Sequence, residues 1–139
     1  MIDTHAFTPL TAIVALFIGL LYVVLVSLIK EPNRQHFNAL MVAGAGAAYL
    51  NGGLMELEFV FCTVMTYVAF KGLKNYNWLG VGWLLHTGWD LVHHFYGNPI
   101  VPMDSLSSLG CAICDPVIAL WFFMGAPSIF KLFNKQTAA

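Results

Sequence analysis

Charged side chains are scarce in this sequence of 139 residues. They make up 9% of the chain, while hydrophobic residues make up 59%. A soluble domain usually has about 25% charged residues, since these residues stay almost entirely at its surface. The six basic and seven acidic side chains are too few to cover a domain of this size. We therefore exclude a soluble globular protein and expect an integral membrane protein whose surface faces the lipid bilayer.

Three further features are missing, and each absence excludes a class of protein. The chain has no basic tract and a net charge of −1, so a nucleic-acid partner is not expected. Its three cysteines are too few for a disulfide framework. The stretch MIDTHAFTP at the start contains no Lys or Arg, so the first apolar run lacks the basic flank of a signal peptide. We expect this run to be a permanent transmembrane helix.

Apolar segments that approach the length of a bilayer crossing, about 20 residues, recur along the chain. The stretches KEPNR, NGG, KGLKNYN and GNPIVP separate them. We predict an all-α integral membrane bundle of five transmembrane helices, with the whole chain, 1–139, as one domain. The predicted spans are about 9–29, 36–51, 54–70, 78–96 and 106–130.

Pro116 leaves two interpretations of the last span. The favoured one is a single helix that is kinked at this proline. In the other, Asp115 caps a helix whose first residue is Pro116. The preceding stretch SLSSLGCAIC would then be a half-inserted segment, which is tolerable only where protein buries it.

The basic residues indicate the orientation of the five spans. They are Lys30, Arg34, Lys71, Lys74, Lys131 and Lys135. All of them follow the first, third or fifth span, so they lie on one side of the membrane. Because cytoplasmic loops carry an excess of Lys and Arg, we expect this side to be cytoplasmic. The N-terminus is then outside and the C-terminus is in the cytoplasm.

The fourth predicted span carries four ionisable groups within HTGWDLVHHFYGNP, residues 86–99. At about 100° per residue, His86, Asp90 and His93 lie within about 60° of one another on one helix face. A charged group that faces lipid at mid-depth costs at least about 2.5 kcal/mol. We therefore expect these side chains to face a polar pocket.

Two other predicted spans place polar groups at the same depth, in the outer leaflet. The third span carries Glu58 there. The fifth span presents Cys111, Cys114 and Asp115 on one face if it is a continuous helix. The three helices can thus line one outer-leaflet pocket.

The spacing His-x3-Asp-x2-His predicts a transition-metal site in this pocket, because two imidazoles and a carboxylate on successive turns can bind one ion. The predicted ligands are His86, Asp90, His93, His94, Cys111 and Cys114, with Asp115 as a further candidate. This mixture of donors suits Zn, Cu or Fe. The competing interpretation is a structural network in which Asp90 hydrogen-bonds a histidine and joins two helices.

Other classes of function stay open. In an enzyme, Glu58, Asp90 and Asp115 would act as acids or bases on a lipophilic substrate such as an isoprenoid, a sterol-like lipid or a quinone. In a structural or accessory subunit, the same polar groups would only hold helices together. The cysteine pair could form a disulfide, exchange thiols or simply pack. The small-residue patch AGAGAA, 43–48, makes a homo-oligomer plausible.

Two blocks of the sequence carry a resemblance to a known family. GWDLVHHFYGNPI, residues 88–100, and SSLGCAICDPVIALWFF, residues 107–123, resemble an uncharacterised bacterial family of small membrane proteins, described only as a domain of unknown function. The resemblance covers most of the chain. It implies a multipass protein of the bacterial cytoplasmic membrane, and it implies no activity and no functional residue.

Overall fold

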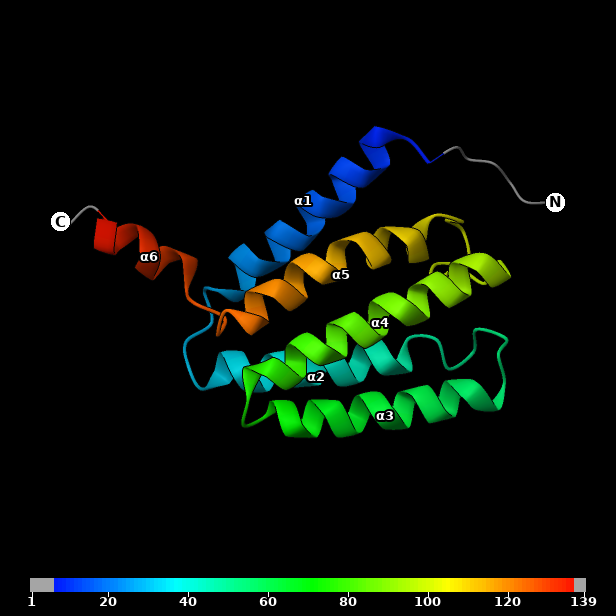
Figure 1. Cartoon of the computed structure of the whole chain (residues 1–139), viewed down its shortest axis with the longest axis horizontal. Coiled ribbons are helices and arrows are strands. Elements are labelled where there is room, and N and C mark those ends of the chain that lie inside the picture. Colours follow the sequence, from blue (N-terminus) through cyan, green and yellow to red (C-terminus); the bar gives the residue numbers. More distant parts are fainter. Residues whose placement is uncertain (1–6, 137–139) are drawn as a thin grey trace.

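The computed structural model describes residues 7–136, and these residues form helices and no strand. The helices are α1 (Pro9–Val26), α2 (Asn33–Ala47), α3 (Glu56–Gly72), α4 (Tyr76–Tyr96), α5 (Ser107–Phe123) and α6 (Ile129–Gln136) (Figure 1). The predicted all-α class is confirmed for this part of the chain.

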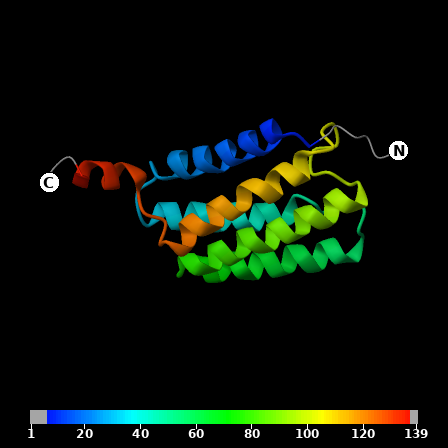
Figure 2. The same ribbon diagram turned by 45° about the horizontal axis from the view of Figure 1, so that its top comes forward.

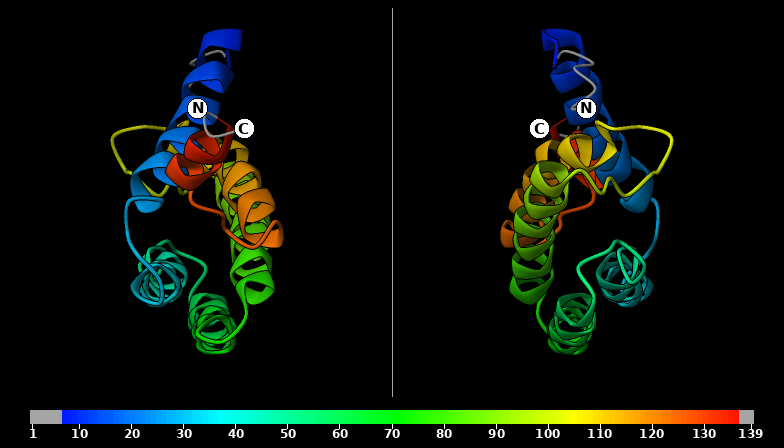
Figure 3. Two further views of the ribbon diagram at one scale, coloured as in Figure 1. Left: turned by 90° about the vertical axis from the view of Figure 1, so that its left-hand side faces the viewer. Right: turned by 90° about the vertical axis from the view of Figure 1, so that its right-hand side faces the viewer.

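Helices α1 to α5 lie side by side and run alternately in opposite directions along one bundle (Figure 1, Figure 2). The connections α1–α2, α3–α4 and α5–α6 lie at one end of the bundle, and the connections α2–α3 and α4–α5 lie at the other. Figure 3, which views the bundle end-on, shows the helices in a curved row from α1 through α5, α4 and α3 to α2. Helix α5 packs against both α1 and α4, and α4 also packs against α2 and α3.

Local signals in the sequence begin and end these helices. Pro9 opens α1 after Thr8, whose Oγ1 accepts a hydrogen bond from a backbone N–H of the first turn at 3.3 Å. Asn75 caps α4 in the same way at 2.9 Å. Gly97 ends α4 with a φ of 74°, a left-handed conformation that glycine adopts without strain.

Helix α5 runs through Pro116 without interruption, so Asp115 lies within the helix and does not begin one. The favoured interpretation of a continuous helix agrees with the structure. The helix ends at Phe123, however, and not near residue 130. Gly125 has a φ of 82° and Pro127 has no N–H to donate, so a short break separates α5 from α6.

Small residues let the central helices approach closely. A Cβ atom added to Gly46 of α2 would lie 2.3 Å from Cβ of Met65 in α3. A Cβ atom added to Gly82 of α4 would lie 2.6 Å from Cγ1 of Val42 in α2. Met65 and Val42 belong to the apolar core, which fills the half of the bundle near the α3–α4 connection. The other half contains the buried polar side chains described below.

Large apolar side chains also cover the outside of the bundle. Phe17 of α1 is 62% exposed, and Phe59 and Phe70 of α3 are 65% and 63% exposed. Among the described helices, α1 is the one whose length and composition fit a membrane span, and α5 is apolar but shorter. The structure therefore has an apolar exterior together with a partly polar interior.

Candidate functional site

His86, Asp90 and Asp115 meet in the polar half of the bundle. His86 and Asp90 are one turn apart on α4, and Asp115 comes from α5, the helix that packs beside it. The three residues are 3%, 0% and 2% exposed. Burial of three ionisable groups is strongly unfavourable unless they bind one another or an ion.

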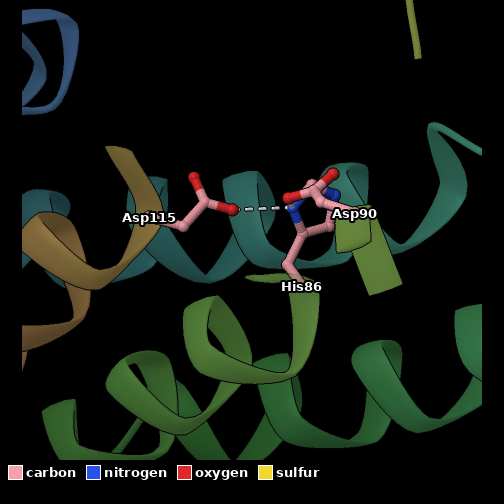
Figure 4. A group of neighbouring side chains, drawn as sticks. All are labelled: His86, Asp90 and Asp115. Carbon is pink, nitrogen blue, oxygen red and sulfur yellow. Dashed lines mark hydrogen bonds and ion pairs between the residues drawn. The ribbon is translucent and has the colours of Figure 1, made fainter. Parts of the chain in front are cut away.

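One ring nitrogen of His86 faces both carboxylates (Figure 4). Its Nδ1 lies 2.8 Å from Oδ2 of Asp115 and 3.0 Å from Oδ2 of Asp90. One ligand atom from each residue lies within 4.8 Å of the other two. Apart from the contact with His86, Oδ2 of Asp90 has no hydrogen-bond partner among the described residues. A nitrogen and two oxygens thus converge on a position that can hold a metal ion.

The second ring nitrogen of His86 is held by α2. Nε2 lies 3.1 Å from the backbone carbonyl oxygen of Ala45 in α2. Because a carbonyl oxygen only accepts hydrogen bonds, Nε2 carries the hydrogen and donates it. Nδ1 then either carries a proton and donates to the carboxylates, or is bare and shares a metal ion with them. Metal-binding histidines are commonly oriented by such a second N–H donor.

Asp90 of α4 is held by a chain of two hydroxyl groups, one from Tyr49 just beyond α2 and one from Ser108 of α5. The Tyr49 hydroxyl donates to Oδ1 of Asp90 at 2.6 Å and lies 2.6 Å from Oγ of Ser108. Since the single Tyr49 proton goes to Asp90, Ser108 donates to Tyr49. Ser108 in turn accepts from the backbone N–H of Ile100 at 2.9 Å. This chain of hydrogen bonds starts at the α4–α5 connection, runs into the bundle and orients the Asp90 carboxylate.

Aromatic rings surround the imidazole of His86. The ring of Trp83 meets it edge-on with centroids 6.1 Å apart. The rings of Phe61 and Tyr49 lie tilted to it at 6.4 Å and 5.9 Å. These rings exclude water from the cluster and so strengthen its electrostatic interactions.

The two cysteines of α5 lie beside the cluster but outside the group of converging ligand atoms. Sγ of Cys114 donates to Oδ1 of Asp115 at 3.3 Å. Cys114 is buried and Cys111 is half-buried, and both are free thiols. Cys114 therefore contacts the oxygen of Asp115 that does not face His86.

His93 belongs to a second polar cluster, with Glu58. Its Nδ1 lies 3.2 Å from the carbonyl oxygen of Asn98 and must donate to it. Its Nε2 has no hydrogen-bond partner among the described residues and lies 3.9 Å from Oε1 of Glu58. The Glu58 carboxylate accepts the backbone N–H groups of Gly52 at 3.1 Å and Leu54 at 2.9 Å. Glu58 thus anchors the α2–α3 connection.

The structure separates the predicted ligands into distinct places. It brings together His86, Asp90 and Asp115, and it places His93 next to Glu58. His94 is half-buried beside Phe95 and is not in the converging group. The predicted acid–base candidates are likewise divided, because Glu58 does not meet Asp90 or Asp115 in that group.

Sequence reasoning missed Tyr49 and Ser108 as functional residues. Ser108 precedes Asp115 by seven residues, which is about two helical turns and places both on one face of α5. That spacing was the available signal for Ser108. Tyr49 lies just beyond the end of α2, and nothing in the local pattern points to Asp90 as its partner.

The fold and this geometry define a helical protein with a buried His–Asp–Asp cluster that can hold a metal ion. The chain belongs to a family of unknown function, DUF6010, whose model matches residues 10–128. The match includes both sequence blocks that carried the resemblance, so membership of an uncharacterised family is confirmed. No curated protein and no solved structure shows significant similarity to the chain.

Proposed function

We propose that this protein is an integral membrane protein that holds a resident divalent transition-metal ion at His86, Asp90 and Asp115. The observation that supports the metal most directly is the convergence of one imidazole nitrogen and two carboxylate oxygens, fully buried, on one position. The ion bound at this centre would serve either the storage and delivery of the metal or a metal-dependent reaction.

The charge of the cluster favours a divalent ion. With a neutral imidazole the two carboxylates carry two negative charges, which a divalent ion balances. A protonated imidazole in place of the ion balances only one carboxylate, so the other carboxyl must then take up a proton. Among the described residues, the ion pairs of Asp90 and Asp115 involve His86 alone. An unbalanced buried charge is strongly unfavourable, and a divalent cation neutralises both carboxylates at once, where two protons would otherwise be needed.

The donor atoms favour Zn(II) or Fe(II) over Cu(I). Imidazole and carboxylate ligands suit the former, whereas thiolates select Cu(I). Two ligands at about 2.1 Å from an ion are about 3.4 Å apart at the tetrahedral angle usual for Zn(II), and about 3.0 Å apart at the right angle of octahedral coordination. The distances from Nδ1 of His86 to the two carboxylate oxygens, 2.8 Å and 3.0 Å, are close to the octahedral value. The cysteines lie outside this set and are not needed as ligands.

A resident ion fits the surroundings better than a transported one. The half of the bundle near the α3–α4 connection is filled by an apolar core that includes Val42, Met65, Leu79 and Phe122. Among the described residues, the polar side chains buried in that half are Ser27, Arg34 and Asn38. None of them is a carboxylate, imidazole or thiol, and Arg34 carries a positive charge that disfavours a passing cation. The proposed centre therefore binds a metal from the outer side and retains it.

The membrane location is supported by the arrangement of the helices. Helices α1 to α5 run along the long axis of the bundle in alternating directions, as five transmembrane spans would. The basic residues lie in the α1–α2 connection, at the start of α2, at the α3–α4 connection and in α6, and these elements share one end of the bundle. That end would be cytoplasmic, in a bacterial inner membrane, with the N-terminus outside. The exposed apolar side chains would face lipid.

Elemental analysis of the protein purified in detergent tests the metal centre. Wild type should contain about one Zn or Fe per chain, and His86→Gln and Asp115→Asn should lose it while eluting as folded protein on gel filtration. His94→Ala is the matched control, because His94 is on the same helix but outside the converging group. It should keep the metal.

Absence of metal from wild type, even after addition of Zn(II) and Fe(II), would overturn the metal proposal. The cluster would then be a hydrogen-bonded network that joins α2, α4 and α5. Retention of metal by both ligand variants would contradict the assignment of the ligands. The topology has its own test: a green fluorescent protein fused to the C-terminus should fluoresce, and one inserted in the 98–105 connection should not.

A further inference from the structure

A cleft of about 330 Å³ opens between α1 and α5. It is lined by Thr11, Val14, Ile18, Gly110, Cys111 and Cys114, among others. Asp104 and Ser107 give it polar groups near the α4–α5 connection. Both thiols of the C-x-x-C pair thus lie along one cleft, although the metal proposal uses neither of them.

The two thiols can form a disulfide within α5. Residues three apart in an α-helix have Cα atoms about 5 Å apart, and disulfides usually join Cα atoms about 4.4–6.8 Å apart. Pro116 follows the pair inside the helix and removes the backbone hydrogen bond to the carbonyl of Ala112. The turn that contains the pair is therefore easier to adjust than an ordinary helical turn.

We propose that the α1–α5 cleft binds a lipid-soluble quinone, which oxidises Cys111 and Cys114 to a disulfide. In this reaction two S–H bonds break and one S–S bond forms. The two electrons and two protons that leave the thiols reduce the quinone to a quinol, and the protons end on its two ring oxygens. No other oxidant is required.

The lining of the cleft favours this class of ligand. Apart from Thr11, Asp104 and Ser107, the lining is apolar or thiol. Its volume is near the lower limit of ligand pockets, about 300–1,000 Å³, and suits one ring with the beginning of a tail rather than a whole lipid. Val14 and Ile18 are exposed and border the cleft, so it opens on a surface that faces lipid in the proposed membrane orientation. The inference rests on that membrane location and not on the metal.

Thiol counting measures the reaction directly. Reduced protein in lipid nanodiscs, kept anaerobic and with a chelator to exclude metal-catalysed oxidation, is mixed with a short-chain ubiquinone analogue. Maleimide-polyethylene glycol added after denaturation then labels the thiols that remain. Of the three free cysteines, only Cys62 of α3 should still be labelled. Cys62→Ser should leave none, and one quinol should appear per protein.

Two glycine variants separate the cleft from the rest of the surface. A Cβ atom added to Gly110 of α5 or to Gly88 of α4 meets no atom within 4 Å, so a side chain can begin at both positions without a clash. Gly110→Phe should fill the cleft and slow oxidation by the quinone about tenfold or more, which corresponds to the loss of one good apolar contact. Gly88→Phe should react like wild type, and the hydrophilic oxidant diamide should oxidise both variants.

Each other outcome overturns the proposal. If diamide forms the disulfide but the quinone does not, the cleft binds a different molecule, such as a lipid chain. Equal rates for Gly110→Phe and Gly88→Phe would place the reaction elsewhere on the protein. If diamide also fails with wild type, the two cysteines cannot close a disulfide. A protein without bound metal should still form the disulfide with the quinone, because the metal proposal uses neither thiol.

Discussion

Replacement of Tyr49 by phenylalanine tests the chain of hydroxyl groups that holds Asp90. The Tyr49 hydroxyl donates to Oδ1 of Asp90 at 2.6 Å and accepts from Ser108 at 2.6 Å. The ring itself stacks on His93 with centroids 3.9 Å apart, and phenylalanine keeps this contact. The substitution therefore removes the two hydrogen bonds and little else.

The magnitude follows from the burial of both partners. A hydrogen bond to a charged group contributes about 1.5–3 kcal/mol, and a buried hydroxyl left without its acceptor costs about 1–3 kcal/mol. Asp90 and Ser108 are both fully buried, so water cannot replace the lost hydroxyl. We expect Tyr49→Phe to lower the free energy of unfolding by about 2.5–6 kcal/mol, the sum of the two effects.

Titration with sodium dodecyl sulfate, followed by tryptophan fluorescence of the protein in mixed micelles, measures this change. Tyr96→Phe is the control, since Tyr96 is exposed at the end of α4. The double variant of Tyr49→Phe with Ser108→Ala should lose less than the sum of the two single variants, by at least about 0.5 kcal/mol, because both act on one chain. A Tyr49→Phe protein within about 0.5 kcal/mol of wild type would refute the reasoning.

Three further expectations concern packing, the α2–α3 connection and the metal. Gly82→Leu should lower the free energy of unfolding by about 1–3 kcal/mol, because even a Cβ atom would lie 2.6 Å from a valine methyl of α2. Gly88→Leu should leave the free energy of unfolding unchanged. Equal losses in the two variants would contradict the close contact of Gly82 with α2. Glu58→Gln should speed amide hydrogen exchange in the α2–α3 connection, whereas Glu56→Gln, at an exposed position, should not. Zn(II) at about 100 times its Kd should stabilise wild type by about 2.7 kcal/mol but not Asp115→Asn, and acidification should weaken binding because protons compete for the ligands.

The sequence by itself determined the helical class and many helix limits, but the second span, predicted at 36–51, lies at Asn33–Ala47. Hydropathy and breaking residues act locally along the chain. Pro9 and Asn75 therefore begin helices, and Gly97 ends one, however the helices pack on one another. The break at Gly125 and Pro127 was underestimated, because an apolar run continues on both sides of it. The pairing of His86 with Asp90 also followed from sequence, since residues four apart share a helix face.

Angle on a helix does not give depth. His93 shares the face of His86 but lies seven residues further on, about 10.5 Å along the helix axis. At that level its neighbours are Tyr49 and Glu58, so it joins a different cluster. The prediction of one site used the helix face alone, although the seven-residue spacing already implies this axial separation.

Only the tertiary structure decided which partner each polar side chain meets. Asp115 reaches His86 because α5 packs on α4, and Tyr49 reaches Asp90 because Gly46 and Gly82 bring α2 close to its neighbours. A hydrogen bond requires two atoms within about 3 Å, with their groups correctly aligned. Hydropathy patterns specify a helix face to within about one residue, or 100°. The position of the neighbouring helix supplies the remaining precision, and it depends on packing between segments that are distant in the chain.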